Sequence, residues 1–229
     1  MSGRRRLVIA VDGPAGAGKS TVAKRVAERL GLDYLDSGAM YRALAWKALK
    51  RGIDLRDEDQ LTALLAKTSI VLDSDPQGRP RIRVDGQEVG EALRSPEVNA
   101  AVSLVAGFAR VRAEMVARQR EMAAAGGVVM DGRDIGTNVL PNADLKFFLT
   151  ASLRARAERR WRELRDQGFA VDLETVAEEI AHRDQLDAGR AVGPLRQAPD
   201  AILIDTTDSD IETVVEELLR YCRPRVCRS

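Results

Sequence analysis

The sequence predicts an α/β fold with a five-stranded parallel sheet flanked by helices, and three observations support this prediction. Five short apolar runs alternate little with polar residues, which is typical of strands covered on both faces. Amphipathic patterns, in which apolar residues recur at three- and four-residue spacing, lie between these apolar runs. A glycine-rich turn follows the first run and opens such a pattern. We expect the strands at residues 7–12, 33–36, 128–131, 145–150 and 201–205.

Two helices have clear signals at their ends. The helix after the first strand carries one apolar stripe, and Gly31 is expected to stop it. The last helix carries a similar stripe over residues 211–219. Asp208 or Ser209 is expected to cap this last helix, and Pro224 lies beyond its expected end.

Two segments interrupt the alternation of strands and helices. Residues 69–90 contain the turn signals DPQG and DG, and polar and apolar side chains alternate over residues 81–85. This alternation indicates a half-buried antiparallel strand, so we expect a small β insertion on the α/β core. Residues 154–168 crowd six arginines onto one expected helix, which is the second candidate insertion.

The composition restricts the partners and the compartment. Of the 229 residues, 45% are hydrophobic and 31% are charged, as in a globular protein with a sizeable core. The net charge is +1, so we expect binding neither to nucleic acid nor to a membrane. No run approaches the ~20 apolar residues of a membrane span, and the first apolar run is too short for a signal peptide. Cys222 and Cys227 are expected to be free thiols in a reducing cytoplasm.

Residues 13–20, GPAGAGKS, match the phosphate-binding pattern G-x-x-x-x-G-K-[ST] at every fixed position. Gly16 and Gly18 let backbone N–H groups turn toward phosphate oxygens, and the following helix adds the positive end of its dipole. Lys19 can reach the β- and γ-phosphates, while the Ser20 hydroxyl can ligate Mg²⁺. The alternative is a glycine-rich turn with an incidental Lys-Ser pair. The strand before the motif and the helix after it favour binding of a nucleoside triphosphate.

Arginines at the ends of other expected strands favour a second phosphate site. The segments that carry them are YLDSGAMYRA with Arg42, MDGRDIGT with Arg133, and HRDQLDAGRAVGPL with Arg183, Asp187 and Arg190, the last three on one expected helical face. A planar guanidinium group matches phosphate oxygens in bidentate fashion. Ligands of α/β sheets bind at the carboxyl ends of the strands, so these segments favour a small kinase. For each segment alone, the alternative is a solvated surface loop.

Together these motifs resemble the bacterial-type cytidylate kinase family, whose members are P-loop nucleoside monophosphate kinases acting on CMP and dCMP. The resemblance runs nearly end to end through IAVDGPAGAGKST, LDSGAMYRALA, SLVAGFARVR, DGRDIGTNVLPNADLKFFLTAS and RDQLDAGRAVGPL. It implies one kinase unit, with a five-stranded parallel core, a monophosphate-binding β insertion and a helical lid. We place the core at residues 1–65, 100–153 and 170–229, the insertion at about 66–99, and the lid at about 154–169.

The resemblance also implies roles for individual residues. The ATP phosphates would be held by Gly13, Pro14, Ala15, Gly16, Ala17, Gly18, Lys19, Ser20 and Thr21. CMP would be bound by Ser37, Arg42, Ser103, Arg112, Arg133, Asp134, Arg183, Asp187 and Arg190. Phosphoryl transfer would depend on Lys19, Arg133, Arg156, Arg159 and Arg160. Mg²⁺ would contact Ser20, where some family members have glycine, and Asp131 would hold a water of the Mg²⁺ shell.

The proposed base contacts are consistent with the chemistry of cytosine. A carboxylate such as Asp134 can accept from the 4-amino group, and Arg112 can donate to N3 or O2, whereas uracil would set a carbonyl against the carboxylate. For Ser103 and Arg112 the alternative is a pair on a helix surface. Two rival functions remain open at this point, a kinase for another small acceptor such as UMP, dTMP or shikimate, and a P-loop NTPase or nucleotide sensor. We expect a monomer that uses ATP with Mg²⁺.

Overall fold

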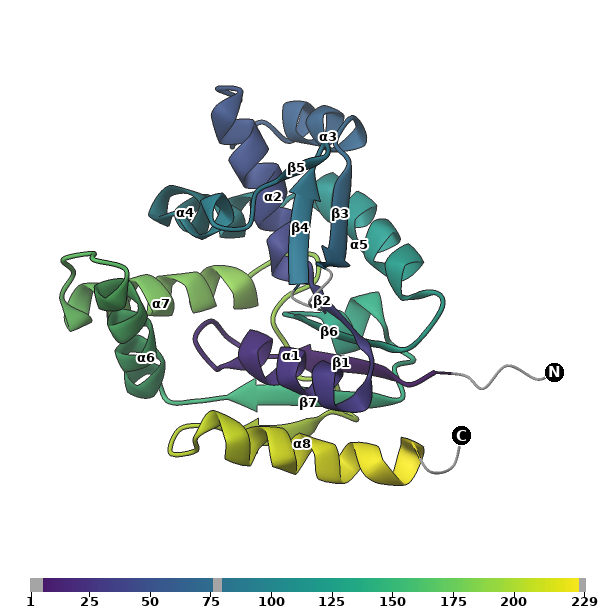
Figure 1. The fold of residues 1–229 in the computed structure, drawn as a ribbon. Helices are drawn as coiled ribbons and strands as arrows, with labels where there is room; N and C mark the ends of the chain where they lie inside the picture. Colours follow the sequence, from purple (N-terminus) through teal and green to yellow (C-terminus); the bar gives the residue numbers. More distant parts are fainter. Residues whose placement is uncertain (1–5, 76–79, 227–229) are drawn as a thin grey trace. The chain divides into compact units, whose positions relative to one another are not determined.

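The computed structural model describes residues 6–75 and 80–226, which are drawn in colour in Figure 1. The chain divides into two compact units, and each is described by itself. The first unit consists of Met1–Tyr34 and Ala125–Ser229, and the second unit consists of Leu35–Ala124.

The main sheet has five strands in the order β2-β6-β1-β7-β8, which confirms the predicted five-stranded parallel sheet. β1 lies in the middle, and its last residue, Asp12, is in register with Gly132 at the end of β6. The carboxyl ends of neighbouring strands therefore meet at one edge of the sheet. The strands are β1 (Val8–Asp12), β2 (Asp33–Asp36), β6 (Val128–Gly132), β7 (Leu145–Thr150) and β8 (Ile202–Asp205).

Two helices of the first unit share one hydrophobic core with the sheet. They are α1 (Lys19–Leu30) and α8 (Ile211–Val226), which run beside each other in Figure 1. α1 ends at Gly31 as predicted, since this residue takes the left-handed conformation at φ 63°. Val22, Val26 and Leu218 are among the buried side chains of this core, so the sequence stripes do mark the covered faces.

Both ends of α8 differ from the prediction. The capping residue is Asp210 instead of Asp208 or Ser209, because its Oδ1 accepts a 2.7 Å hydrogen bond from Thr213 N. The helix also continues to Val226, past Pro224. A proline fixes φ at a helical value, and close to a helix end it removes only one backbone hydrogen bond.

A helical hairpin follows β7 in the first unit. It consists of α6 (Leu153–Asp166) and α7 (Leu173–Ala188), which pack against each other around a small apolar cluster. Trp161 adds a hydrogen bond of 3.0 Å from Nε1 to Val171 O. Because α7 ends at Ala188, Arg190 lies beyond the helix, and the expectation of a shared helical face with Arg183 and Asp187 is wrong for Arg190.

The second unit combines helices with an antiparallel sheet of order β3-β4-β5, which confirms the predicted β insertion. The DG turn between β4 and β5 has positive φ at both residues, 51° at Asp85 and 82° at Gly86. The elements are α2 (Ser37–Lys50), α3 (Glu58–Ala66), β3 (Ile70–Ser74), β4 (Pro80–Val84), β5 (Gln87–Glu88), η1 (Ala92–Arg94), α4 (Pro96–Val105) and α5 (Ala109–Ala123).

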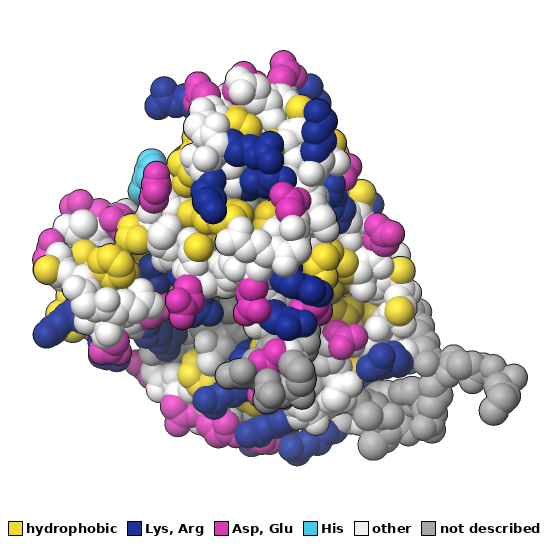
Figure 2. Space-filling model, turned by 45° about the horizontal axis from the view of Figure 1, so that its top comes forward, with side chains coloured by type: hydrophobic (Ala, Val, Ile, Leu, Met, Phe, Trp, Pro, Cys, Tyr) yellow, Lys and Arg dark blue, Asp and Glu magenta, His cyan; other side chains and the backbone are white. Residues whose placement is uncertain are grey.

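The surface and the cysteines are consistent with the composition. On the face drawn in Figure 2, basic and acidic side chains are interspersed. Within residues 6–75 and 80–226, no helix is both long and apolar enough to span a bilayer. Cys222 is a free, buried thiol, and burial raises its pKa to about 12. Cys227 lies outside the described residues.

Candidate functional site

The glycine-rich loop connects the end of β1 with the start of α1, as the motif requires. Gly13 has φ 145°, and a Cβ atom there would lie 1.9 Å from Leu149 O. Only glycine fits this position, because the loop passes directly over the backbone of β7. The N-terminus of α1 therefore opens at the carboxyl edge of the sheet, where backbone N–H groups and the helix dipole favour an anion.

Lys19 is a buried cation at the start of α1. Its Nζ donates a 2.7 Å hydrogen bond to Pro14 O, so the lysine folds back over its own loop. Burial, and secondly the positive charge of Arg133, lower the pKa of Lys19 to about 7. A phosphate at this position would return the lysine to its charged form, because an opposite charge favours it.

Ser20 and Asp131 face each other across the edge of the sheet. Ser20 Oγ donates to Asp131 Oδ2 at 2.8 Å, and Tyr34 OH donates to Asp131 Oδ1 at 2.9 Å. Asp131 is buried, and the hydrogen bonds from these two hydroxyl groups fix the orientation of its carboxylate. Tyr34, the first residue of the segment YLDSGAMYRA, was not predicted as a site residue.

Asp134 begins the segment after β6 and is buried. Asn138 Nδ2 donates to Asp134 Oδ2 at 3.0 Å, which fixes the carboxylate. The segment continues as the π-helical turn η2 (Ile135–Val139). π-helical turns often occur at functional sites.

Arg133 belongs to a cluster with Asp187 and Arg190. Arg133 Nε donates to Asp187 Oδ2 at 2.7 Å, and Arg190 Nη2 donates to the other carboxylate oxygen. Burial acts to raise the pKa of Asp187, but Arg133, Arg190 and Arg183 together hold it below its ordinary value. One carboxylate is thus shared by two guanidinium groups, and the remaining positive charge suits a phosphate.

The three arginines of α6 that were predicted to serve the transfer make different contacts. Arg156 is buried, and its Nη1 donates to Ala15 O in the glycine-rich loop at 3.1 Å and to Asp184 Oδ2 at 2.5 Å. Arg159 donates to the oxygens of Thr206, with Nη1 3.0 Å from Oγ1. Arg160 pairs with Glu163 of its own helix at 2.7 Å.

In the second unit, Arg42 is held close to the start of α2. Its Nη2 donates to Asp36 Oδ2 at 2.6 Å, and Asp36 also caps α2 by accepting from Ala39 N. Ser37 is buried beside this cap. The local sequence DSGAMYR therefore brings a hydroxyl group and a guanidinium group to one helix N-terminus.

Ser103 on α4 and Arg112 on α5 are both buried, which excludes the alternative of a pair on a helix surface. Arg112 is only 1% exposed. Its Nη1 donates to Ala106 O at 3.2 Å, and its guanidinium lies 5.5 Å from the ring centroid of Tyr41. A buried guanidinium is costly unless it serves structure or a ligand.

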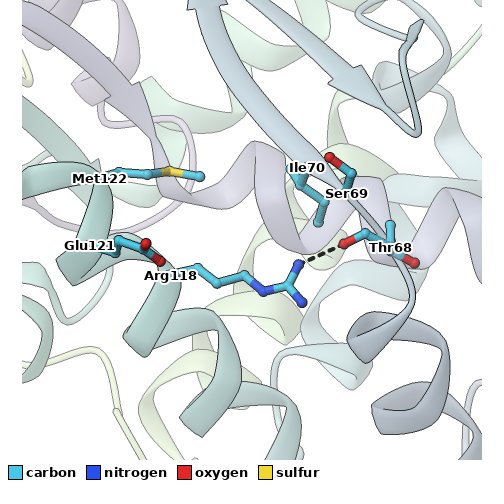
Figure 3. A pocket seen from close by; sticks show the side chains of 6 residues that line it. All are labelled: Thr68, Ser69, Ile70, Arg118, Glu121 and Met122. Atoms are coloured by element: carbon cyan, nitrogen blue, oxygen red, sulfur yellow. Dashed lines mark hydrogen bonds between the residues drawn. The ribbon is translucent and has the colours of Figure 1, made fainter.

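A separate pocket of about 450 Å³ in the second unit is drawn in Figure 3. It is lined by Thr68, Ser69, Ile70, Arg118, Glu121 and Met122. Arg118 donates to Thr68 O at 2.7 Å and to Leu65 O at 2.9 Å, so it satisfies carbonyl groups at the end of α3. We assign this pocket no part in nucleotide binding.

Asp12 is a site residue that the sequence analysis did not identify. It is 3% exposed, and burial outweighs the hydrogen bonds from Gly136 N and Ile135 N to raise its pKa to about 6. The only signal for it was its place directly before Gly13.

Asp12 should make the stability of the protein dependent on pH. Its folded pKa, about 6, exceeds the ordinary 3.8, so its contribution is fully present below pH 3.8 and is lost as the pH rises through 6. Relative to Asp12→Asn, the wild type should lose about 2 kcal/mol between about pH 4.5 and about pH 7.5. Urea unfolding of both proteins measures this difference. A difference that does not change with pH would contradict the raised pKa.

The predicted site residues fall into two sets, one in each unit. The first unit holds the glycine-rich loop and the residues Asp131, Arg133, Asp134, Arg156, Arg159, Arg160, Arg183, Asp187 and Arg190. The second unit holds Ser37, Arg42, Ser103 and Arg112. Contacts join Arg133 and Arg190 to Asp187, Ser20 to Asp131, and Arg156 to the glycine-rich loop, whereas Arg160 contacts Glu163 of its own helix. The partners that were not predicted are Asp12, Tyr34, Asn138, Asp184 and Thr206.

Comparison with known proteins adds independent evidence. The family model described as cytidylate kinase matches residues 9–224. The cytidylate kinase of Geobacillus kaustophilus is 55% identical over 223 residues, covering 97% of this chain and 99% of that protein. The cytidylate kinase of Bacillus subtilis is 52% identical over 215 residues, covering 94% of this chain and 96% of that protein.

Among solved structures, an uncharacterized protein from Eubacterium ventriosum has a similar fold. The TM-score is 0.53 with 12% identity, and the match covers 94% of this chain and 98% of that one. Identity this low supports the fold alone. The sequence relatives and the family model span nearly the whole chain. The chain therefore belongs to the cytidylate kinase family of nucleoside monophosphate kinases.

Proposed function

We propose that the protein transfers the γ-phosphoryl group of ATP to CMP and dCMP, forming ADP and CDP or dCDP. The observation that carries this proposal is the segment after β6. It presents the guanidinium of Arg133 and the fixed carboxylate of Asp134 from the same unit as the glycine-rich loop. The relatives described above are named cytidylate kinases, and this supports cytosine as the base.

The chemistry needs positioning more than it needs a base. The acceptor oxygen of CMP is already an anion, so the main obstacle is repulsion between two polyanions. Lys19 and the arginine cluster around Asp187, all within the first unit, supply positive charge. As the family resemblance implies, Arg42 and Ser37 would supply donors to the acceptor phosphate, while Arg183 and Asp187 would bind the sugar.

Base selection follows from the donors and acceptors that the buried groups offer. Asp134 has only acceptor oxygens when ionised, so it complements the 4-amino group of cytosine. Arg112 can donate only, which suits N3 or O2 of the base. Ser103 would add a hydroxyl contact at the same edge. Uracil would place a carbonyl against Asp134, and a buried site penalises such a mismatch strongly.

The residues present fit a magnesium ion that travels with the nucleotide. Ser20 Oγ and Asp131 Oδ2 are hard oxygen donors 2.8 Å apart, and phosphate oxygens and water normally complete the shell of Mg²⁺. Within the described residues, no group of three or more His, Cys, Asp or Glu could hold a metal on its own. The bound ion would neutralise phosphate charge. Ser20 would contact it and Asp131 would hold one of its waters.

Asp131→Asn should raise the Mg²⁺ concentration required for half-maximal activity by about 10-fold, because the carboxylate that would hold a water of the Mg²⁺ shell is replaced by a neutral amide. A Mg²⁺ titration at saturating ATP and CMP measures this change. Asp144→Asn serves as a control, since Asp144 accepts from Val8 N at the other end of β1. An unchanged Mg²⁺ requirement in Asp131→Asn would contradict this role.

The segment at about residues 154–169, which contains most of α6, would act as the lid, with Arg160 as the arginine that turns toward the transferred group. Arg160 forms an exposed ion pair with Glu163 on its own helix, and breaking such a pair costs little free energy. Arg156 and Arg159 would hold the lid to the glycine-rich loop and to the loop after β8.

Arg160→Ala should lower kcat by roughly 10- to 100-fold and change CMP affinity little, because the side chain would act in the transition state. Arg162→Ala is a matched control, because Arg162 pairs with Glu158 on the same helix and is more exposed. Steady-state kinetics with CMP measures both variants. A variant that loses CMP affinity while kcat stays constant would place Arg160 in the acceptor site instead.

A coupled ADP-release assay over a panel of acceptors tests the proposal. CMP and dCMP should be preferred over UMP, dTMP and shikimate, and ATP turnover without an acceptor should be slow. Preference for another acceptor would contradict the cytosine assignment. ATP turnover that does not depend on any monophosphate would identify an NTPase or a sensor instead.

We further propose that the protein acts as a monomer in the cytoplasm.

A further inference from the structure

Asp12 reaches away from the glycine-rich loop that follows it. Its Oδ1 accepts a 2.8 Å hydrogen bond from Ile135 N, and its Oδ2 accepts a 2.7 Å hydrogen bond from Gly136 N. These partners lie 123 and 124 residues away along the chain. One buried carboxylate on β1 therefore holds the backbone of the segment that follows β6.

The two N–H groups are the first donors of η2, which have no acceptor inside the turn. Asp134 occupies the position before η2, but its side chain makes no capping hydrogen bond. Its carboxylate instead accepts from Asn138. Asp12 thus caps η2 in place of Asp134.

A second side chain approaches the same backbone. Lys146 on β7 donates from Nζ to Asp200, and its stem lies over Gly136. A Cβ atom on Gly136 would lie 3.1 Å from Lys146 Cδ and 3.3 Å from Asp12 Oδ2. The close approach favours glycine, because a Cβ atom would push against both side chains, and it leaves the segment little room to shift.

We propose that Asp12 is a positioning residue for the acceptor nucleotide, because it fixes Arg133 and Asp134 relative to the strand that feeds the glycine-rich loop. The inference rests on the proposed function for the identity of the acceptor. The inference goes beyond the proposed function because it assigns a role in acceptor binding to a residue that would contact neither nucleotide.

The charges around Asp12 are consistent with this role. Asp134 lies close enough to repel it and Lys19 close enough to attract it. Two backbone donors and one cation offset part of the cost of burying this carboxylate. An ionised oxygen pair accepts both N–H groups at once, whereas the amide of asparagine would turn its own NH₂ toward one of them.

The test compares Asp12→Asn with Asp144→Asn in the full-length protein. Asp144 Oδ2 also accepts a backbone N–H, from Val8 at 2.8 Å, but at the opposite end of β1. Binding of CMP in the absence of ATP, measured by calorimetry, should weaken about 10-fold or more in Asp12→Asn, as expected for a lost buried hydrogen bond. ATP binding should change less than about 3-fold, and Asp144→Asn should bind both nucleotides as the wild type does.

Amide exchange of Ile135 and Gly136 provides a readout that does not depend on the nucleotide. Both amides should be protected in the wild type and exchange about 10-fold faster in Asp12→Asn, because the carboxylate no longer accepts from both. Gly136→Ala provides a second route if Asp12→Asn does not fold. It keeps both donors but crowds Asp12 and Lys146, so it should also weaken CMP selectively.

Each outcome decides between separate claims. Equal loss of CMP and ATP binding, or unchanged CMP binding with faster amide exchange, would overturn the positioning role. Unprotected amides in the wild type would overturn the structural basis of the inference. A wild type with protected amides that binds another monophosphate in place of CMP would contradict only the proposed function.

Discussion

Lys19→Met should lower kcat by about 10²- to 10³-fold, which is the usual cost of removing one electrostatic contact to the charge that develops in the transition state. The lysine stands at the start of α1, already buried and folded over its own loop. Methionine keeps the length and apolar stem of the side chain but cannot neutralise phosphate charge. Single-turnover transfer with saturating ATP and CMP measures the chemical step directly.

The same substitution should leave the fold intact at neutral pH. The folded pKa of Lys19, about 7, is below the ordinary 10.5, so the charged form is disfavoured by folding. Its stabilising contribution is present above pH 10.5 and is lost as the pH falls through 7, so removing the amine costs little at pH 7. Lys24→Met, on the exposed side of α1, is the matched control and should keep normal activity. Near-normal turnover in Lys19→Met would contradict the assignment of the glycine-rich loop to ATP.

Asp134→Asn should reduce the preference for CMP over UMP by about 100-fold or more. A site that hydrogen-bonds a polar group of its substrate strongly rejects an analogue that lacks this group. Asparagine has nearly the same shape but can donate to the 4-carbonyl of uracil. The variant should therefore lose CMP activity and gain UMP activity. Ratios of kcat/KM for the two nucleotides measure the change.

Asp134→Ala separates the two effects. It removes the acceptor without adding a donor, so CMP activity should fall while UMP activity stays low. Asn138 donates to the Asp134 carboxylate at 3.0 Å. Asn138→Ala should change the CMP-to-UMP ratio of kcat/KM less than either Asp134 variant does. An unchanged CMP-to-UMP ratio in both Asp134 variants would assign base recognition to other residues, with Ser103 and Arg112 the first candidates.

The parts of the fold that follow from local signals were predictable. The strands, α1 and the glycine-rich loop are specified within a few neighbouring residues. The bounds of the strands agree with the prediction to within a residue, and α1 ends where predicted. The alternation over residues 81–85 predicted the antiparallel sheet for the same reason. The predicted capping residue of α8 was wrong because Asp208, Ser209 and Asp210 all have side chains that can cap a helix. Only the backbone geometry selects one of them.

Contacts between distant residues were not predictable from the pattern. Nothing in VDGPAGAGKS shows that Asp12 accepts from residues of η2 more than a hundred positions later. The sequence RVRAEM likewise does not distinguish a buried Arg112 from a solvated one, because helix patterns constrain apolar residues more tightly than charged ones. Arg156 was expected to contact the transferred phosphate. Its contact with Ala15 O was not predicted, because this contact depends on where α6 begins relative to the glycine-rich loop.

The most direct test of the proposed reaction follows the γ-phosphate of ATP to its destination. Wild-type protein incubated with γ-labelled ATP and CMP should form labelled CDP in proportion to the ADP released, and dCMP should give labelled dCDP. Lys19→Met should form neither at a comparable rate. Label that appears as inorganic phosphate, at a rate independent of CMP, would contradict the account and identify a hydrolase.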